Sequence, residues 1–312
     1  MSLVRLVSSP RGLAVLAVVV LAVWIGSHTA HHENDDVFQA LFAHLSPAPL
    51  ELEHGEPLGI EAPWLPSLFT MDSHGRTTGR LVVTNLQVFQ AAAIVLVFVC
   101  FAGVAKRIRT GRGDALGGLF AGFAKWIRDE MVYPAMGRER GRRFLPFFLC
   151  LFFFVLFMNV FGLVPGAATA TASIAVTCAL ALITFASMIV LGMVAQGPVK
   201  FWTSLVPHVP LALWPLMFVV EVIGLCVKPF ALMIRLFANM TGGHLIVLSC
   251  MGLIMFFGAK GANAFAGWGS APLAIGFAVF IMIIETFVAL LQAYIFTMLS
   301  ILFVGAAVHP EH

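Results

Sequence analysis

The sequence predicts an all-α polytopic membrane protein, and three observations carry that prediction. Of the 312 residues, 60% are hydrophobic and 11% are charged, and the mean hydropathy is +0.98, which excludes an ordinary soluble domain. Several apolar runs reach the length of about 20 residues that a membrane-spanning helix needs. The few charges are sorted along the chain. We expect about five transmembrane helices after an N-terminal apolar segment.

Residues 1–30 are interpreted as a signal-like or anchor segment. Arg5 and Arg11 precede an apolar run from Gly12 to Gly26, which is short for a span and suits the core of a signal peptide. Cleavage is favoured, and an uncleaved anchor is the alternative. A cluster of histidines and acids follows, without the spacing that fixes metal ligands, so a solvated tail is favoured over a metal site. It consists of His28, His31, His32, Glu33, Asp35 and Asp36.

Charge sorting predicts the orientation of the chain. Between residues 30 and 80, eight Asp and Glu outnumber two Lys and Arg, whereas between residues 106 and 143 ten Lys and Arg outnumber four acids. The positive-inside rule puts the basic stretch in the cytoplasm. Residues 31–83 therefore form an extracytoplasmic polar segment, expected as extended chain and short helices. The first span, from about Thr84 to Ala105, joins the two regions.

Part of the basic stretch is predicted to lie along the cytoplasmic membrane surface. Asp114 is a candidate N-cap, and apolar residues recur every three to four positions from Leu116 to Met131. Lys125 and Arg128 fall outside that apolar face. Such an amphipathic pattern predicts a helix in the plane of the interface, not a span.

The next apolar block predicts a membrane hairpin. No charged residue occurs from Phe144 to Val199, and Pro165-Gly166 divides the block into spans at about 145–164 and 170–195. Lys200 then returns the chain to the cytoplasmic side.

The last two apolar blocks are predicted to be long, tilted helices that form an antiparallel hairpin. The first runs from about residue 210 to 258, too long for one perpendicular span, so it requires a tilt or a kink, for which Pro229 is the candidate. An outer loop is expected at residues 260–272, and the second helix at 273–308. Residues 309–312 are then a cytoplasmic tail.

Four ionisable residues within these two blocks point to ion handling. A charge at the centre of a membrane helix costs about 2.5 to 3.5 kcal/mol on insertion scales, so several are not expected without a use. The charges are Glu221, Lys228, Arg235 and Glu285, and their polar companions are Asn239, His244 and Gln292.

Helix geometry sorts these residues by direction. At about 100° per residue, Glu221 and Asn239 project within about 40° of Arg235. His244 is rotated from Arg235 by about 180° and lies roughly 13 Å along the axis. Since the two helices are antiparallel, His244 is expected near Glu285 at their outer ends.

The motif around Arg235 resembles subunit a of the rotary F-type ATP synthase. It reads Arg235-Leu-Phe-Ala-Asn-Met-Thr-Gly-Gly-His244, and it is accompanied at the family's spacings by further residues. The likeness covers about residues 84–308, taken as one membrane domain. Two departures are Gly242, where alanine is expected, and the placement of the imidazole on the first helix and the carboxylate on the second. The accompanying residues are Glu221, Lys228-Pro229, Glu285, Gln292 to Phe296, Asn159, Gly162-Leu163 and Pro165.

The resemblance implies a proton-translocating stator in a bacterial inner membrane, without a cofactor or bound metal and not catalytic by itself. Its partners would be a ring of proteolipid c subunits, peripheral-stalk b subunits, the rest of the complex and the bilayer, with no nucleic acid. Two offset half-channels would deliver protons to and from the ring carboxylates. Arg235 would take the central role, with a proton pathway of Glu221, His244, Glu285, Asn239 and Gln292 and support from Lys228, Pro229, Asn159 and Pro165.

The chemistry of arginine fits that role. A guanidinium stays protonated at biological pH and has no acceptor site, so it attracts an ionised carboxylate but cannot pass on a proton. Glu and His side chains, by contrast, have pKa values that an environment can move toward ambient pH, as a relay requires.

Other readings remain open for the protein and for single residues. A secondary transporter of a small anion would also use a buried arginine, but would show an internal repeat or paired broken helices, and neither is found. An intramembrane enzyme would carry HExxH, GxSxG or a metal triad, none of which occurs in the spans. Lys228 could pair with Glu221 or snorkel, His244 could be a satisfied buried histidine, and Asn239 and Gln292 could join helices.

Overall fold

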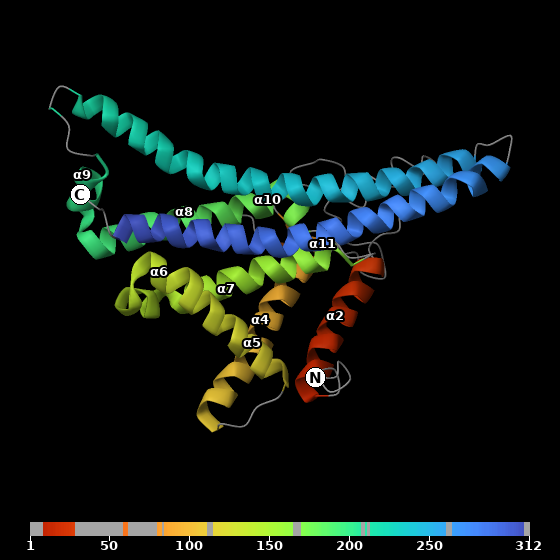
Figure 1. Ribbon diagram of the computed structural model, residues 1–312, viewed down its shortest axis with the longest axis horizontal. Coiled ribbons are helices and arrows are strands. Elements are labelled where there is room, and N and C mark those ends of the chain that lie inside the picture. Colours follow the sequence, from red (N-terminus) through yellow and green to blue (C-terminus); the bar gives the residue numbers. More distant parts are fainter. Residues whose placement is uncertain are drawn as a thin grey trace.

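The computed structural model confirms an all-α membrane protein. It describes residues 9–28, 59–61, 80–82, 84–110, 115–164, 170–206, 210, 213–259 and 264–308. Within them, five helices are long and apolar enough to cross a membrane, at Leu86–Arg107, Arg138–Gly162, Ile174–Gln196, Trp214–Cys250 and Ala271–Ala307. Figure 1 shows two very long helices that lie side by side at one end and diverge toward the other, with shorter helices packed between and beneath them.

The first span and the hairpin agree with the sequence. Helix α4 (Asn85–Thr110) is followed, after the surface segment, by α7 (Arg138–Gly162), a short 3-10 turn η3 (Ala170–Ala172) and α8 (Ile174–Gln196). The Pro165-Gly166 break lies outside the described residues. A seven-residue helix, α9 (Pro198–Ser204), follows α8 and carries Lys200.

The predicted surface helix is present, with an internal change of helix type. Helix α5 (Ala115–Trp126) continues into a π-helical turn η2 (Ile127–Val132) and a short α6 (Tyr133–Met136). Ile127, Met131 and Val132 are fully buried. The wider π turn changes the direction of the side chains that follow it, and periodicity alone does not reveal such a turn.

Helices α10 (Trp214–Ala259) and α11 (Ala264–Val308) form the predicted antiparallel pair. At 1.5 Å per residue, the 46 residues of α10 extend about 69 Å, more than twice the roughly 30 Å of a bilayer core, so α10 is strongly tilted. Pro229 lies inside it, and Figure 1 shows α10 bending over its first half.

The prediction of an outer loop at residues 260–272 is wrong for most of these residues. Helix α11 begins at Ala264, and Pro272 lies inside it. Residues 264–271 contain three alanines, which favour a helix, and two glycines, which do not. Proline removes a single backbone hydrogen bond there, and the helix continues through it.

The N-terminal apolar run forms helix α2 (Pro10–His28), which packs on α4. Ala22 of α2 and Phe89 of α4 are buried in the same apolar cluster. Whether this segment is cleaved stays a prediction. Two three-residue strands, β1 (Gly59–Glu61) and β2 (Arg80–Val82), pair antiparallel within the segment expected outside the membrane. The His/acid cluster beyond His28 lies outside the described part of the chain.

An aromatic core fixes the membrane helices around α7. The Phe153 ring is 1% exposed and lies 5.4 Å from the Phe101 ring of α4 and 5.2 Å from the Phe120 ring of α5, both edge to face. Such arrangements stabilise aromatic pairs beyond the area they bury. The same cluster continues to Leu236 of α10 and Phe296 of α11, both 0% exposed, so the long pair is packed on this core.

Candidate functional site

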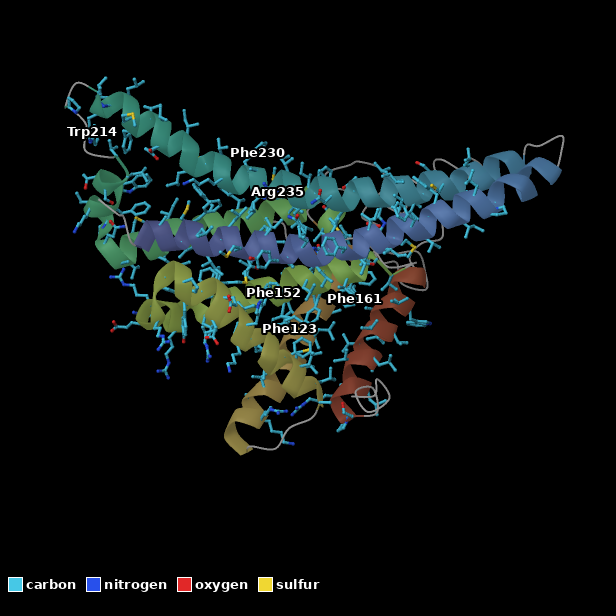
Figure 2. All side chains as sticks on the ribbon, viewed as in Figure 1. Phe123, Phe152, Phe161, Trp214, Phe230 and Arg235 are labelled. Carbon is cyan, nitrogen blue, oxygen red and sulfur yellow. The ribbon has the colours of Figure 1, made fainter. Side chains whose placement is uncertain are left out.

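Arg235 lies near the middle of α10, where Figure 2 labels it. Its neighbours Leu232 and Leu236 are 1% and 0% exposed and face the core, whereas Arg235 itself is on the exposed side of the helix. Within the described ranges, no carboxylate lies within 4.0 Å of its guanidinium nitrogens. Among the described residues, the Arg235 guanidinium therefore has no carboxylate partner.

Asn239, one turn after Arg235, joins α10 to α11. Its side-chain Nδ2 donates a hydrogen bond of 3.0 Å to Oε1 of Gln292. Gln292 is 1% exposed, and its Nε2 has no acceptor in the described structure. Buried polar atoms are almost always paired, so this unpaired donor marks a place where another polar group would be accommodated.

His244 and Glu285 are brought together further along the same pair of helices. The His244 Nε2 lies 3.7 Å from the Glu285 Oε1, beyond hydrogen-bond distance but within range of electrostatic attraction. The Glu285 side chain is 6% exposed, and Oε1 has no hydrogen-bond partner among the described residues. Because burial of an isolated charge is costly, this carboxyl group requires a nearby compensating group.

Gly243 makes room for the Glu285 carboxyl group, a contact that was not predicted from the sequence. A Cβ atom at position 243 would lie 2.6 Å from both Cδ and Oε1 of Glu285. Only glycine fits there without movement of the acid. Glycine inside a helix costs roughly 0.5 to 1 kcal/mol relative to alanine, and that unfavourable choice beside His244 is the signal that would have revealed the contact.

Glu221 and Lys228 do not form the intrahelical pair that was one reading of their spacing. Lys228 is exposed, and its Nζ lies over the Phe303 ring of α11, 5.4 Å from the ring centroid, a cation–π arrangement. Glu221 is partly exposed on the preceding turns. Pro229 is buried within α10.

Asn159 of α7 is hydrogen-bonded to the backbone of α11. It is fully buried in α7, and its Nδ2 donates a hydrogen bond of 3.2 Å to the backbone carbonyl of Ala289. Its Oδ1 has no donor within the part of the chain that the structure describes. The other supporting residue, Pro165, lies outside the described residues.

The polar residues of the long helices thus fall into two groups on either side of Arg235. One group is joined across α10 and α11 and comprises Asn239, Gln292, His244 and Glu285. The other comprises Glu221 and Lys228, toward the beginning of α10. Arg235 separates them and, within the described chain, contacts neither group by an ion pair.

Comparisons with known proteins agree on one family. The family model described as ATP synthase A chain matches residues 87–305. "ATP synthase subunit a" of Myxococcus xanthus is 46% identical over 187 residues, covering 60% of this chain and 59% of the relative. "ATP synthase subunit a" of Anaeromyxobacter sp. (strain Fw109-5) is 41% identical over 225 residues, covering 71% and 53%. The chain thus spans a little over half the length of these relatives.

A longer match comes from a third relative. "ATP synthase subunit a 2" of Chlorobaculum tepidum is 35% identical over 311 residues, covering 96% of this chain and 84% of the relative. This match includes the N-terminal part that the family model does not cover.

Proposed function

This chain belongs to the ATP synthase A chain family, and from that premise we propose that it is the proton-translocating stator of an F-type ATP synthase membrane sector. In this role it provides two half-channels to the carboxylates of a rotating c ring and couples proton flow to rotation. It carries out no catalysis alone and works with the c ring, the peripheral-stalk b subunits and the rest of the complex. Residues 84–308 form its membrane domain.

The observation that carries the proposal is the exposed guanidinium of Arg235 without a carboxylate of its own chain within the described residues. A permanent cation on a membrane-facing surface needs an anionic partner, because an isolated charge in hydrocarbon is costly. A carboxylate on each passing ring subunit supplies that partner from outside the chain. Since arginine does not release its proton, a carboxylic acid must ionise before it meets Arg235.

The two polar groups of the long helices have the roles of proton pathways in this proposal. His244 and Glu285, with Asn239 and Gln292, serve the side toward the outer ends of α10 and α11. Glu221 serves the cytoplasmic side, with Lys228 and Pro229 shaping that part of α10. Asn159 and Pro165 support the arrangement from the hairpin. Arg235 prevents direct leakage between the two sides.

The proposal also includes an orientation. The basic residues between 106 and 143, many of which lie on α5, η2 and the beginning of α7, are on the cytoplasmic side of a bacterial inner membrane. The segment before α4 is outside, residues 1–30 act as a signal-like or anchor segment, and residues 309–312 are cytoplasmic.

Substitution of Arg235 tests the proposal. Arg235→Ala and Arg235→Lys should both insert and assemble, because loss or retention of a charge there does not hinder insertion, and neither should support ATP synthesis. A buried lysine readily loses its proton and lacks the planar fork. The alanine variant should also leak protons through the membrane sector, and the lysine variant much less.

The readouts are ATP synthesis in vesicles that contain the whole complex and decay of a pH gradient in vesicles that contain only the membrane sector. Arg143→Gln, which removes an exposed arginine at the beginning of α7, is the control and should keep both activities. Normal ATP synthesis by Arg235→Ala would refute the mechanism.

A further inference from the structure

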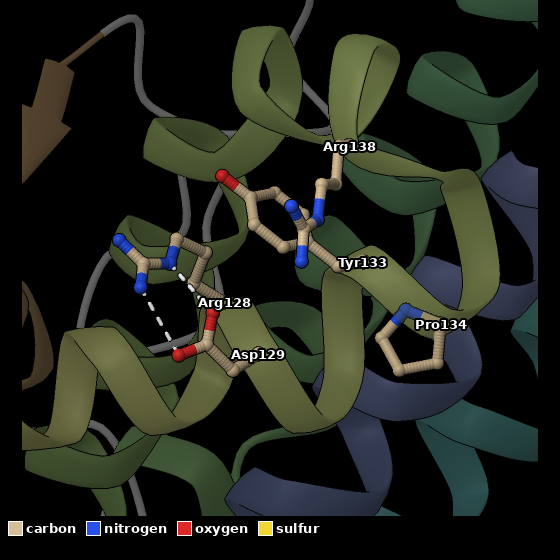
Figure 3. Close-up of a pocket in the computed structure, with 5 residues that line it drawn as sticks. All are labelled: Arg128, Asp129, Tyr133, Pro134 and Arg138. Carbon is tan, nitrogen blue, oxygen red and sulfur yellow. Dashed lines mark hydrogen bonds and ion pairs between the residues drawn. The ribbon is translucent and has the colours of Figure 1, made fainter.

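A polar pocket of about 540 Å³ lies away from the α10–α11 site, where η2 and α6 lead into α7. It is lined by Arg128, Asp129, Tyr133, Pro134 and Arg138. Figure 3 shows the Arg128 side chain bonded to Asp129, and the Arg138 side chain extending toward the Tyr133 ring. The proton pathway proposed above uses none of these residues.

Ion pairing within the pocket leaves one positive charge uncompensated. The Arg128 Nε donates to Asp129 Oδ1 at 2.8 Å, and its Nη2 donates to Oδ2 at 3.0 Å. This two-bond pair balances Arg128, so two guanidinium groups and one carboxylate give a net charge of +1. The pair does not use the Nη1 hydrogens of Arg128. Together with the Arg138 guanidinium, they can donate to an oxygen-rich anion.

The charges of the pocket persist over the physiological pH range. The hydrogen bonds from Arg128 lower the pKa of Asp129, and the nearby charges of Arg128, Lys125 and Arg138 lower it further. Asp129 therefore stays ionised at neutral and mildly acidic pH, and arginine stays protonated. A net charge of +1 favours a singly charged phosphodiester over a polyphosphate.

The position of the pocket selects the source of that phosphodiester. Arg138 is the first residue of α7, and the charge-free part of that helix begins six residues later, at Phe144. The pocket therefore lies about 9 Å from the start of the hydrocarbon, at the level of the lipid headgroups. The adjoining helix α5 exposes Phe123 and Trp126, at 43% and 42%. Apolar side chains beside a basic pocket are suited to acyl chains below a phosphate group.

We propose that this pocket binds the phosphodiester headgroup of an anionic phospholipid, with Arg138 and Arg128 donating hydrogen bonds to its oxygens. The Tyr133 ring, which lies 5.6 Å from the Arg128 guanidinium carbon, holds that guanidinium in place by a cation–π contact. The site anchors the surface segment α5–η2–α6 at the membrane interface. This inference does not rest on the proposed proton pathway.

Short-chain lipid binding to the purified assembly tests the proposal. The assembly is stripped of lipid in detergent and titrated with dihexanoyl phosphatidylglycerol or dihexanoyl phosphatidylcholine, and bound lipid is counted by native mass spectrometry. We expect one saturable site that binds phosphatidylglycerol about tenfold more tightly than phosphatidylcholine. The affinity for phosphatidylglycerol should not change between about pH 5 and 8.

Matched arginine variants separate the pocket from the general basic surface. Arg138→Gln and Arg128→Gln should each weaken phosphatidylglycerol binding by about tenfold, whereas Arg143→Gln, which removes the same charge from an exposed position outside the pocket, should change it less than about twofold. Arg138→Lys keeps the positive charge but lacks the planar guanidinium, so it should weaken phosphatidylglycerol binding less than Arg138→Gln and more than Arg143→Gln. All three positions are at least partly exposed, and each of the four variants is checked for assembly by size-exclusion chromatography.

A competition arm identifies the source of the phosphate. Inorganic phosphate at millimolar concentration should not displace phosphatidylglycerol, because free phosphate lacks the acyl chains that hold a lipid at the interface. Equal weakening by Arg143→Gln and Arg138→Gln would overturn the site in favour of diffuse surface attraction. Complete displacement by inorganic phosphate would overturn the lipid as its ligand.

Discussion

The replacement of Gly243 by alanine is the smallest change that should disturb the His244–Glu285 pair. The added Cβ would lie 2.6 Å from the Glu285 Cδ, whereas ordinary van der Waals contact begins at 3.4 Å. The carboxyl group must therefore move by about 0.8 Å or more, or the two helices must separate by a similar distance. Either movement changes the 3.7 Å separation between the His244 and Glu285 side chains.

The expected cost is larger in function than in stability. Overpacking costs typically about 1 to 3 kcal/mol, and the change from glycine to alanine within a helix returns about 1 kcal/mol. The variant should therefore still insert and accumulate. A displacement near 1 Å at a reacting group can cost up to about 10²-fold in rate, so we expect ATP-driven proton pumping to fall by about tenfold or more.

Gly242→Ala provides the matched control. A Cβ atom at the neighbouring Gly242 would lie within 4 Å of no atom from other parts of the described structure, so the same added methyl group should leave pumping unchanged and favour the helix. The assay is fluorescence quenching of a pH-sensitive dye in inverted vesicles, with the amount of chain measured by immunoblotting. A second variant, Gly243→Ala with Glu285→Asp, shortens the acid and should recover part of the lost rate. Equal pumping by the two single alanine variants would refute the steric argument.

Two further predictions concern the relay and the orientation. Substitution of either His244 or Glu285 alone should slow proton flow in vesicles, whereas the exchange of His244→Glu with Glu285→His should restore part of it, since coupled titrating groups act as a pair; equal loss in single and exchanged variants would argue against a pair. In a background without the five native cysteines, a membrane-impermeant thiol reagent should label Ser73→Cys only from outside and Arg142→Cys only from the cytoplasm. The opposite labelling pattern would reverse the orientation.

The helices themselves were largely predictable because hydrophobic runs and their interruptions report directly on membrane spans. The absence of charge between Phe144 and Val199 predicted the hairpin of α7 and α8, and the spacing of apolar residues predicted helix α5. The loop at 260–272 failed because Pro272 was taken as a boundary, whereas α11 continues through it. A proline shows where one hydrogen bond is lost and not whether the neighbouring turns hold the helix together.

Contacts between helices were predictable only where two polar residues left few alternatives. Antiparallel helices and matching depth indicated that His244 would approach Glu285, and the structure brings the two within 3.7 Å. The bond from Asn159 to the Ala289 carbonyl was not predictable, because a backbone acceptor carries no side-chain signal. The contact of Lys228 with Phe303 likewise depends on the rotation of α11, which its nearly uniform hydrophobicity does not define.

The spacing of polar residues along α10 explains why one tilted helix could serve both proposed half-channels. Glu221 precedes Arg235 by about 21 Å of helix, and His244 follows it by roughly 13 Å. Together they extend over about 35 Å, close to the thickness of the bilayer core, but tilt shortens the vertical distance and moves the two ends apart sideways. A proton that enters near His244 and Glu285 and one that leaves near Glu221 would then be offset in the membrane plane. Because Arg235 lies between these positions, a ring carboxylate in the proposed mechanism could pass from one to the other only by moving past a fixed positive charge. The length and tilt of α10 would then supply the lateral offset that this mechanism requires.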